Sequence, residues 1–308
     1  MLAMIATAAA QAPYPNRNIT LVLPFAAGSG TDTTTRLIGK ELGTALGVST
    51  VIENKAGANG SIAASYVARS PADGYTLFVT TNTTHSANPY LLKNMTYDPV
   101  KDFTPIARTG DLPFMLVIHP DIPANSVAEL IALAKKEPGK YSYASGSSSA
   151  IVSGATFARL AGIDLLHVPY KSSPPALTDV IAGRVSMMFI DVPTGLPHVN
   201  AKALKALAVT TRKPSALLPH LPTMDDTVKG FDITSWQGYL GPANMPKDIV
   251  VRLNAEIRKI IERPDIKNQL AERGMEAFSG TPEEFDAFLK EQLVLWEKLI
   301  ADAGIEKQ

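Results

Sequence analysis

The stretch that most constrains the fold is residues 21–36, LVLPFAAGSGTDTTTR. The apolar run at its start predicts a strand, the small residues up to Gly30 predict a turn, and Thr31 and Asp32 are suited to open a helix. The first N–H groups of a helix have no partner within it, and the helix dipole makes that end partly positive. Such an end can hold an anion without lysine or arginine. An ordinary strand-to-helix turn explains the same residues, so both interpretations stay open here.

Strands and helices alternate through the first third of the chain. The expected elements, in chain order, are strand 18–25, helix 31–46, strand 48–52, helix 61–70 and strand 75–80. This order predicts parallel strands joined by crossover helices in a doubly wound layer. Ligands of such sheets collect beyond the carboxyl ends of the strands, where we expect the loops 26–31 and 81–86, with 53–60 as a further candidate.

The segment TTNTTHS at 80–86 is rich in uncharged hydrogen-bonding groups. Asn82 and Thr83 offer an amide and a hydroxyl, and His85 can be neutral near pH 7. A binding loop and a solvated surface loop explain this composition equally well.

A second unit repeats the strand, small-residue loop and helix start. We expect a helix at 126–136, a strand at 140–144 and a helix at 150–160, with the loop SGSSS at 145–149 before the last helix. Two such helix starts, one in each half of the chain, could face each other across a cleft. Serine and glycine in a row are also typical of flexible linkers, which remains the alternative.

The rest of the chain is expected to complete two layers. Further predicted elements are strand 164–168, helix 175–181, strand 185–190, strand 205–210, a long loop at 212–230, a helix at 249–261 and a long helix opening at the capping box 281–284. Residues 106–118 and 231–240 are mostly extended, and we interpret them as two crossings between domains. Domain 1 is then 13–108 plus 234–308, and domain 2 is 109–233.

Composition excludes several classes of function. Lys+Arg and Asp+Glu both number 29, and this zero net charge argues against nucleic acid or an anionic membrane as a general partner. The absence of cysteine excludes disulfides, thiol catalysis and thiolate metal sites. The five histidines are scattered without metal-ligand spacing, so we expect no metal and no cofactor.

The first twelve residues, MLAMIATAAAQA, look like the end of a secretory signal with an A-x-A cleavage site at 10–12. Their start lacks the usual positive charge, and a disordered extension is the alternative. No later run approaches the length of a membrane span, so we expect an exported protein that does not insert into the membrane.

Catalytic motifs are incomplete. Gly28-Ser29-Gly30 lacks the third glycine of a dinucleotide loop, and no P-loop is present. Gly146 to Ala150 falls one residue short of a nucleophile elbow, and nothing ties a histidine to Ser148. Asp191, after a predicted buried strand, suits an acid, a ligand contact or a helix cap. The remaining inventory of N–H and O–H donors suits a small carboxylate better than bond-breaking chemistry.

Six short motifs occur along the chain, and their order and spacing carry a family resemblance. They are PFAAGSGTD at 24–32, ENKAGANG at 53–60, DGYTL at 73–77, DPVKDF at 98–103, HVPYK at 167–171 and PALTD at 175–179. Together they make the chain resemble, over about residues 15–305, the Bug-type solute-binding proteins of tripartite tricarboxylate transporters.

This resemblance implies an α/β, type II periplasmic binding protein fold, with two α/β domains joined by two crossing strands and a ligand cleft between them. It implies a periplasmic monomer that captures a small carboxylate and delivers it to a membrane permease. The implied carboxylate-binding residues are Phe25, Ala26, Ala27, Gly28, Ser29, Gly30, Thr31, Ser145, Gly146, Ser147, Ser148 and Ser149. Asn82, Thr83, His85, Tyr170 and Asp191 are expected to line the same cleft.

One departure from the family suggests a ligand. Many relatives carry Ser or Thr and then His shortly after the second loop, where this chain has Ala150-Ile151-Val152. A less polar wall would favour an aromatic, terephthalate-like or otherwise apolar-bodied acid over a hydroxylated one such as citrate. The alternatives are a ligand-sensing partner of a signalling receptor and, less favoured, a hydrolase on the same scaffold.

Overall fold

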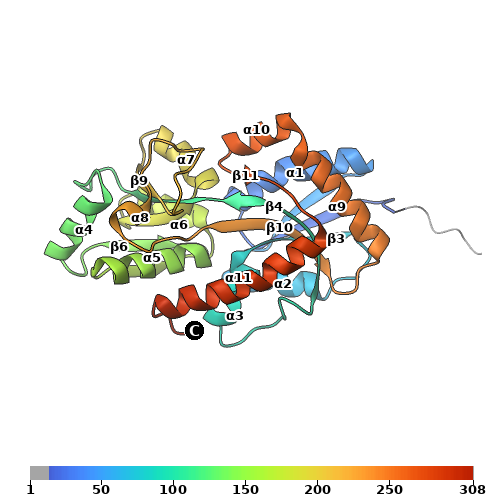
Figure 1. The fold of residues 1–308 in the computed structure, drawn as a ribbon, viewed down its shortest axis with the longest axis horizontal. Coiled ribbons are helices and arrows are strands. Elements are labelled where there is room, and N and C mark those ends of the chain that lie inside the picture. Colours follow the sequence, from blue (N-terminus) through green and yellow to red (C-terminus); the bar gives the residue numbers. More distant parts are fainter. Residues whose placement is uncertain (1–13, 308) are drawn as a thin grey trace, which may run out of the picture.

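The computed structural model describes residues 14–307, so the expected signal segment lies outside the described residues. Two α/β lobes lie side by side, and the chain passes between them twice (Figure 1). We call the lobe built on the six-stranded sheet the large lobe and the lobe built on the five-stranded sheet the small lobe. This arrangement confirms the predicted fold class.

The sheet of the large lobe has the order β11-β4-β10-β3-β1-β2. Its strands are β1 (Ile19–Leu23), β2 (Thr50–Asn54), β3 (Thr76–Thr81), β4 (Phe103–Leu112), β10 (Ser235–Pro242) and β11 (Glu276–Ala277). β1 pairs in parallel with both β2 and β3, as the alternating order predicts. β10 runs antiparallel between β3 and β4.

Helices cover both faces of this sheet. They are α1 (Gly30–Leu46), η1 (Ala58–Gly60), α2 (Ser61–Ala68), η2 (Thr83–Ala87), α3 (Asn88–Leu91), α9 (Lys247–Glu262), α10 (Pro264–Glu272) and α11 (Pro282–Asp302). Successive side chains of a strand point to opposite faces. In β1, Leu21 and Leu23 therefore pack with α1 and α9, whereas Val22 packs with α2 and with Phe285 of α11.

The small lobe repeats this plan with the strand order β7-β6-β8-β5-β9. Its elements are β5 (Phe114–Ile118), α4 (Val127–Lys136), β6 (Ser142–Ser145), α5 (Ser148–Ala161), β7 (Leu166–Pro169), α6 (Ser173–Ile181), β8 (Met187–Asp191), α7 (Val192–Asn200), β9 (Lys205–Val209) and α8 (Met224–Thr227). In β5, Leu116 packs with the α4 and α5 side and Met115 with the α6 side, so helices again cover both faces.

Two segments join the lobes. β4 ends at Leu112, and after Pro113 the chain enters β5 of the other sheet. The return passes through Ile233, whose N–H bonds to Thr210 O at 3.1 Å, before β10 begins at Ser235. These are the two crossings that the extended segments predict.

Several helical elements were not predicted, among them α7, α8, α10 and η2. α7 begins within three residues of Pro193 and Gly195, which obscure a helical pattern, and α8 is a single turn inside the expected long loop. α10 follows α9 directly, with Pro264 as its first residue. The segment that a solvated-loop interpretation would expose, 83–87, is η2, a buried turn of π-helix.

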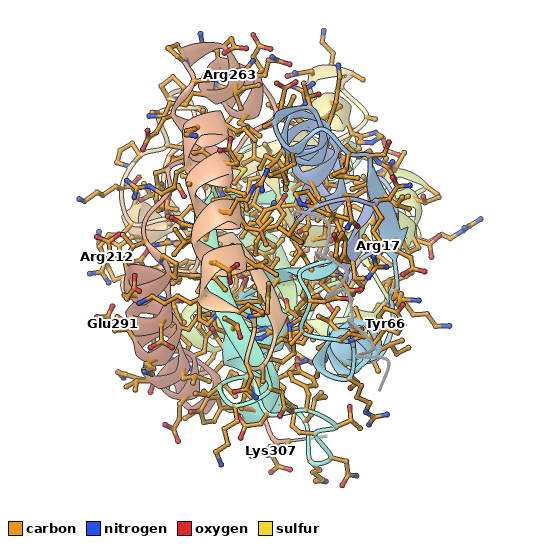
Figure 2. All side chains as sticks on the ribbon, turned by 90° about the vertical axis from the view of Figure 1, so that its right-hand side faces the viewer. Arg17, Tyr66, Arg212, Arg263, Glu291 and Lys307 are labelled. Carbon is orange, nitrogen blue, oxygen red and sulfur yellow. The ribbon has the colours of Figure 1, made fainter. Side chains whose placement is uncertain are left out.

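Four charged side chains mark the outside of the molecule in Figure 2. Arg17, Arg212, Arg263 and Glu291 project from its surface (Figure 2). Within the described residues, no helix is long and apolar enough to cross a membrane, and no group of three or more His, Asp or Glu side chains is placed to hold a metal ion.

Candidate functional site

A cavity between the lobes brings the two predicted helix starts together. It is lined by Phe25, Ser29, Gly30, Thr31, Thr81, Thr83, Leu112, Phe114, Ser147, Ser173, Asp191 and Ser235. The volume open to the centre of a water-sized sphere is about 20 Å³, so the cavity has room for about one water molecule. The lobes are therefore closed on one another, and a small organic acid needs them to separate.

The first helix start is rigidly capped. Ser29, in extended conformation, is the N-cap of α1, and its Oγ accepts the N–H of Asp32 at 3.3 Å. The Asp32 carboxylate in turn accepts the N–H of Gly28 at 3.0 Å and pairs with Arg36 at 2.9 Å. Burial opposes ionisation of Asp32, but the hydrogen bonds from Arg36, Gly28 and Asn54 outweigh it and lower the pKa. This anchoring fixes the loop before α1.

The second helix start has the same cap and makes contacts across the lobes. Ser147 is the N-cap of α5, and its Oγ accepts the N–H of Ala150 at 3.4 Å. The N–H of Ser148 donates to Thr83 Oγ1 at 3.3 Å, and Asn82 Nδ2 donates to Ser149 Oγ at 2.8 Å. The Ser148 hydroxyl is buried and has no hydrogen-bond partner among the residues that the structure describes.

Gly146 holds this loop close to its own lobe. A Cβ at this position would collide with the backbone of Ser172 and Ser173, so only glycine allows the approach. Ser172 also reaches the other lobe, because its Oγ accepts the N–H of Ala26 at 3.1 Å.

Asp191 ends β8, caps α7 and lies in the same cavity. Its Oδ1 accepts the N–H of Thr194 at 3.0 Å and the Thr194 hydroxyl at 2.5 Å. Across the lobe boundary, the carboxylate lies against Gly30 and receives a backbone hydrogen bond from it, and a Cβ at position 30 would collide with Oδ1. Burial raises the pKa of Asp191, and the bonds from Thr194 and Gly30 only partly offset this rise.

His85 does not reach the cavity. Its ring is buried in the large lobe, with Nδ1 2.7 Å from Thr80 Oγ1 and an edge contact to Phe103 at 4.6 Å between centroids. Burial lowers the pKa of His85 to about 3, so the ring is neutral near pH 7. It supports η2, which carries Thr83, from behind the cavity.

Several other expected residues lie around the cavity rather than along it. Ala27 and Gly28 are exposed, and Ser145 Oγ is 2.7 Å from His167 Nε2. Asn82 is buried between Ser149 and the Ser235 hydroxyl, which donates to its Oδ1. These residues shape the two loops without lining the cavity.

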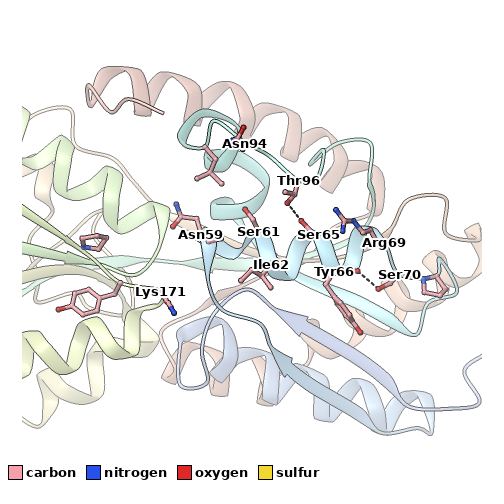
Figure 3. A pocket seen from close by; sticks show the side chains of 15 residues that line it. Asn59, Ser61, Ile62, Ser65, Tyr66, Arg69, Ser70, Asn94, Thr96 and Lys171 are labelled. Carbon is pink, nitrogen blue, oxygen red and sulfur yellow. Dashed lines mark hydrogen bonds between the residues drawn. The ribbon is translucent and has the colours of Figure 1, made fainter. Parts of the chain in front are cut away.

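Tyr170 belongs to a separate groove on the outside of the molecule. Its hydroxyl donates to Asp179 at 2.6 Å, and with Pro169 and Lys171 it forms one wall of this groove. Figure 3 shows Ile62 and Tyr66 of α2 on the opposite wall. The groove is open to solvent and encloses about 1220 Å³, so it is a surface depression shared by both lobes.

The departure at 150–152 does not form a cavity wall. Ala150 and Val152 are buried in the core of the small lobe instead. The apolar lining comes from Phe25 and from Leu112 and Phe114, which flank the first crossing. Sequence reasoning missed these two residues together with Ser173 and Ser235, and it placed Thr81 in the predicted loop 81–86 without singling it out. The only signal for them was their place at the crossings and at element ends, where both lobes meet.

The two lobes, the two crossings and the cavity between them define the class of type II periplasmic binding proteins. Residues 34–305 match the model of the family described as "TctC: Tripartite tricarboxylate transporter family receptor". The chain belongs to this family, and it is a periplasmic binding protein rather than an enzyme.

Three solved structures are similar over almost the whole chain. The R. palustris protein Rpa4515 with adipate is 36% identical, with a TM-score of 0.94 over 96% of this chain and 100% of that one. The periplasmic binding protein BugD is 33% identical, with a TM-score of 0.91 over 96% and 100%. MatC (Rpa3494) from Rhodopseudomonas palustris with bound malate is 29% identical, with a TM-score of 0.87 over 93% and 100%.

Proposed function

We propose that this protein captures a small carboxylate between its lobes and delivers it to a tripartite tricarboxylate-type permease. One observation carries the proposal, namely that the starts of α1 and α5 line a single cavity, from opposite lobes. Helix starts bind carboxylates through free N–H groups and the dipole. Similar proteins are described with adipate and with malate, which supports the ligand class.

The proposed working unit is a monomer with two domains, residues 13–108 plus 234–308 and residues 109–233. Ligand binding closes these domains about the two crossings. The residues proposed to touch the ligand are those of the predicted set that line the cavity, namely Phe25, Ser29, Gly30, Thr31, Thr83, Ser147 and Asp191. The remaining predicted residues of the two loops are proposed to hold these ligand-contacting residues in position.

The proposed ligand has an apolar body, and an aromatic, terephthalate-like acid is included. Phe25, Leu112 and Phe114 give the cavity apolar surface between its polar ends. A more polar acid such as citrate, which carries three carboxylates and a hydroxyl on a short body, would press polar groups against these side chains, where they lose hydrogen bonds to water without replacement.

Calorimetric titration and thermal unfolding test the proposal with adipate, terephthalate, malate and citrate. We expect adipate or terephthalate to bind and to stabilise the protein by about 2.7 kcal/mol at a hundredfold excess over Kd. Adipamide, which has the same length and no charge, is the matched control and should not bind. Failure of every acid would refute carboxylate capture, and tight binding of citrate alone would refute the apolar body.

A further inference from the structure

Among the described residues, Asp191 is the one ionisable residue that lines the interlobe cavity. The other lining residues are glycine, phenylalanine, leucine, serine and threonine. The residue is 7% exposed, and its carboxylate forms no ion pair with any residue in the described range 14–307. Burying a carboxylate without a cation costs free energy. The presence of one in a cavity that is proposed to take an anion therefore needs an explanation.

The hydrogen bonds to Asp191 offset only part of the free-energy cost of burying its charge. Thr194 supplies an N–H and a hydroxyl, both to Oδ1, and Gly30 supplies a backbone bond from the opposite lobe. Burial nevertheless raises the pKa of the carboxyl group. Another hydrogen-bond donor would therefore be favourable beside it, whereas a second negative charge would be repelled.

The two helix starts differ because of this carboxylate. At α1, Asp191 already lies against Gly30, in the position where an anion would bind the helix end. At α5, the contacts of the helix start are with the neutral side chains of Thr83 and Asn82, and the Ser148 hydroxyl has no partner within residues 14–307. An incoming carboxylate is therefore directed to α5, and its other end faces Asp191.

We propose that Asp191 determines specificity by selecting a ligand whose far end donates a hydrogen bond. The class is an apolar-bodied monocarboxylate with a hydroxyl at the opposite end, and a dicarboxylate binds more weakly unless that end is protonated. This inference rests on the proposed function and adds the chemistry of the second end of the ligand.

Two ligand pairs test it on the full-length protein by calorimetric titration at pH 7.5. The pairs are 6-hydroxyhexanoate with adipate, and 4-hydroxybenzoate with terephthalate, so that each pair shares a body and differs at one end. We expect each hydroxy acid to bind wild type at least about tenfold more tightly than its diacid. In Asp191→Asn the gap should shrink to within about threefold, because the neutral amide can accept from a hydroxyl and can also donate to a carboxylate.

Asp191→Asn keeps a good helix cap for α7, so the variant should fold. Asp226→Asn is the matched control, because Asp226 also belongs to a helix cap but lies outside the cavity, and it should leave all four affinities unchanged. Equal effects of Asp191→Asn on both members of a pair would overturn this inference and leave carboxylate capture intact. Binding of none of the four acids to wild type would overturn both.

Discussion

The starts of α1 and α5 look alike in sequence and differ in what they offer a ligand. Both have a serine N-cap in extended conformation, preceded by a loop of small residues, and both line the same cavity. The α1 start lies against the protein's own carboxylate, Asp191, whereas the α5 start meets neutral hydroxyl and amide groups from the other lobe. A sequence motif therefore marks a helix end that is suited to an anion, but the residues that face this end decide whether it is open to one.

The largest expected effect comes from Gly30→Ala. The new methyl group would collide with Asp191 Oδ1 only when the lobes are closed, so closure is opposed while the helix itself is favoured. We expect affinity for the bound acid to fall about 100-fold, with the free energy of unfolding unchanged or raised by up to about 1 kcal/mol.

Titration calorimetry and urea unfolding measure the two quantities on the same sample. The double variant Gly30→Ala with Asp191→Ala removes the collision and should recover part of the lost affinity relative to Gly30→Ala alone. Unchanged affinity in Gly30→Ala would show that Gly30 and Asp191 do not meet in the bound state, and the contrast between the helix starts would fail.

The next effect is on the pH dependence of stability and concerns His85. This residue supports η2, whose Thr83 contacts the start of α5. The pKa of His85 is about 3 in the folded protein, against 6.5 for an ordinary histidine, so between these values the unfolded chain binds a proton that the folded one does not. Stability should therefore fall as the pH drops below about 6.5, by up to about 1.4 kcal/mol per pH unit. Above pH 6.5 the contribution of His85 should be flat.

Urea unfolding from pH 7.5 to pH 5 measures this slope. His85→Gln removes the titrating ring and should flatten the curve, whatever its absolute stability. His220→Gln, at an exposed position, is the matched control and should keep the wild-type slope. The same slope in His85→Gln as in wild type would contradict the assignment.

The smallest effect separates the two N-caps directly. Ser29→Ala and Ser147→Ala each remove one capping hydroxyl, and each should cost about 1 kcal/mol of stability. Because the ligand carboxylate is assigned to α5, Ser147→Ala should weaken binding about tenfold and Ser29→Ala about threefold or less. Thermal unfolding and calorimetry on the pair give both numbers, and a larger loss in Ser29→Ala would reverse the assignment.

Much of the fold follows from local pattern. The strand at 19–23, the glycine turn and the capped helix after it obey rules that act within a few residues, and they were predicted closely. α7 was missed because Pro193 and Pro197 weaken a helical pattern that packing in the small lobe supports. The burial of η2 was missed because polar side chains such as Thr80 and His85 satisfy one another, which only the tertiary structure reveals.

The cavity was predictable only in part. Ser29, Gly30 and Ser147 are marked by their position before a helix. Leu112 and Phe114 carry no chemical signal, and they reach the cavity because the crossing passes beneath it. The partnership of Gly30 with Asp191 joins residues far apart in the chain, and no local rule specifies it.

Helix α11 begins over β4 of the large lobe and ends against the small lobe, where Trp296 and Ile300 pack in the same apolar cluster as Phe157 of α5. α1 and α7 lie across the molecule from it (Figure 1). Because close-packed apolar contacts resist separation, we expect the lobes to pivot near α11 and to part most widely on the α1 and α7 flank. The contact between Gly30 and Asp191 then lies far from the pivot, where the lobes move the most. A change of one atom at this contact should therefore alter the opening between the lobes more than the same change near α11.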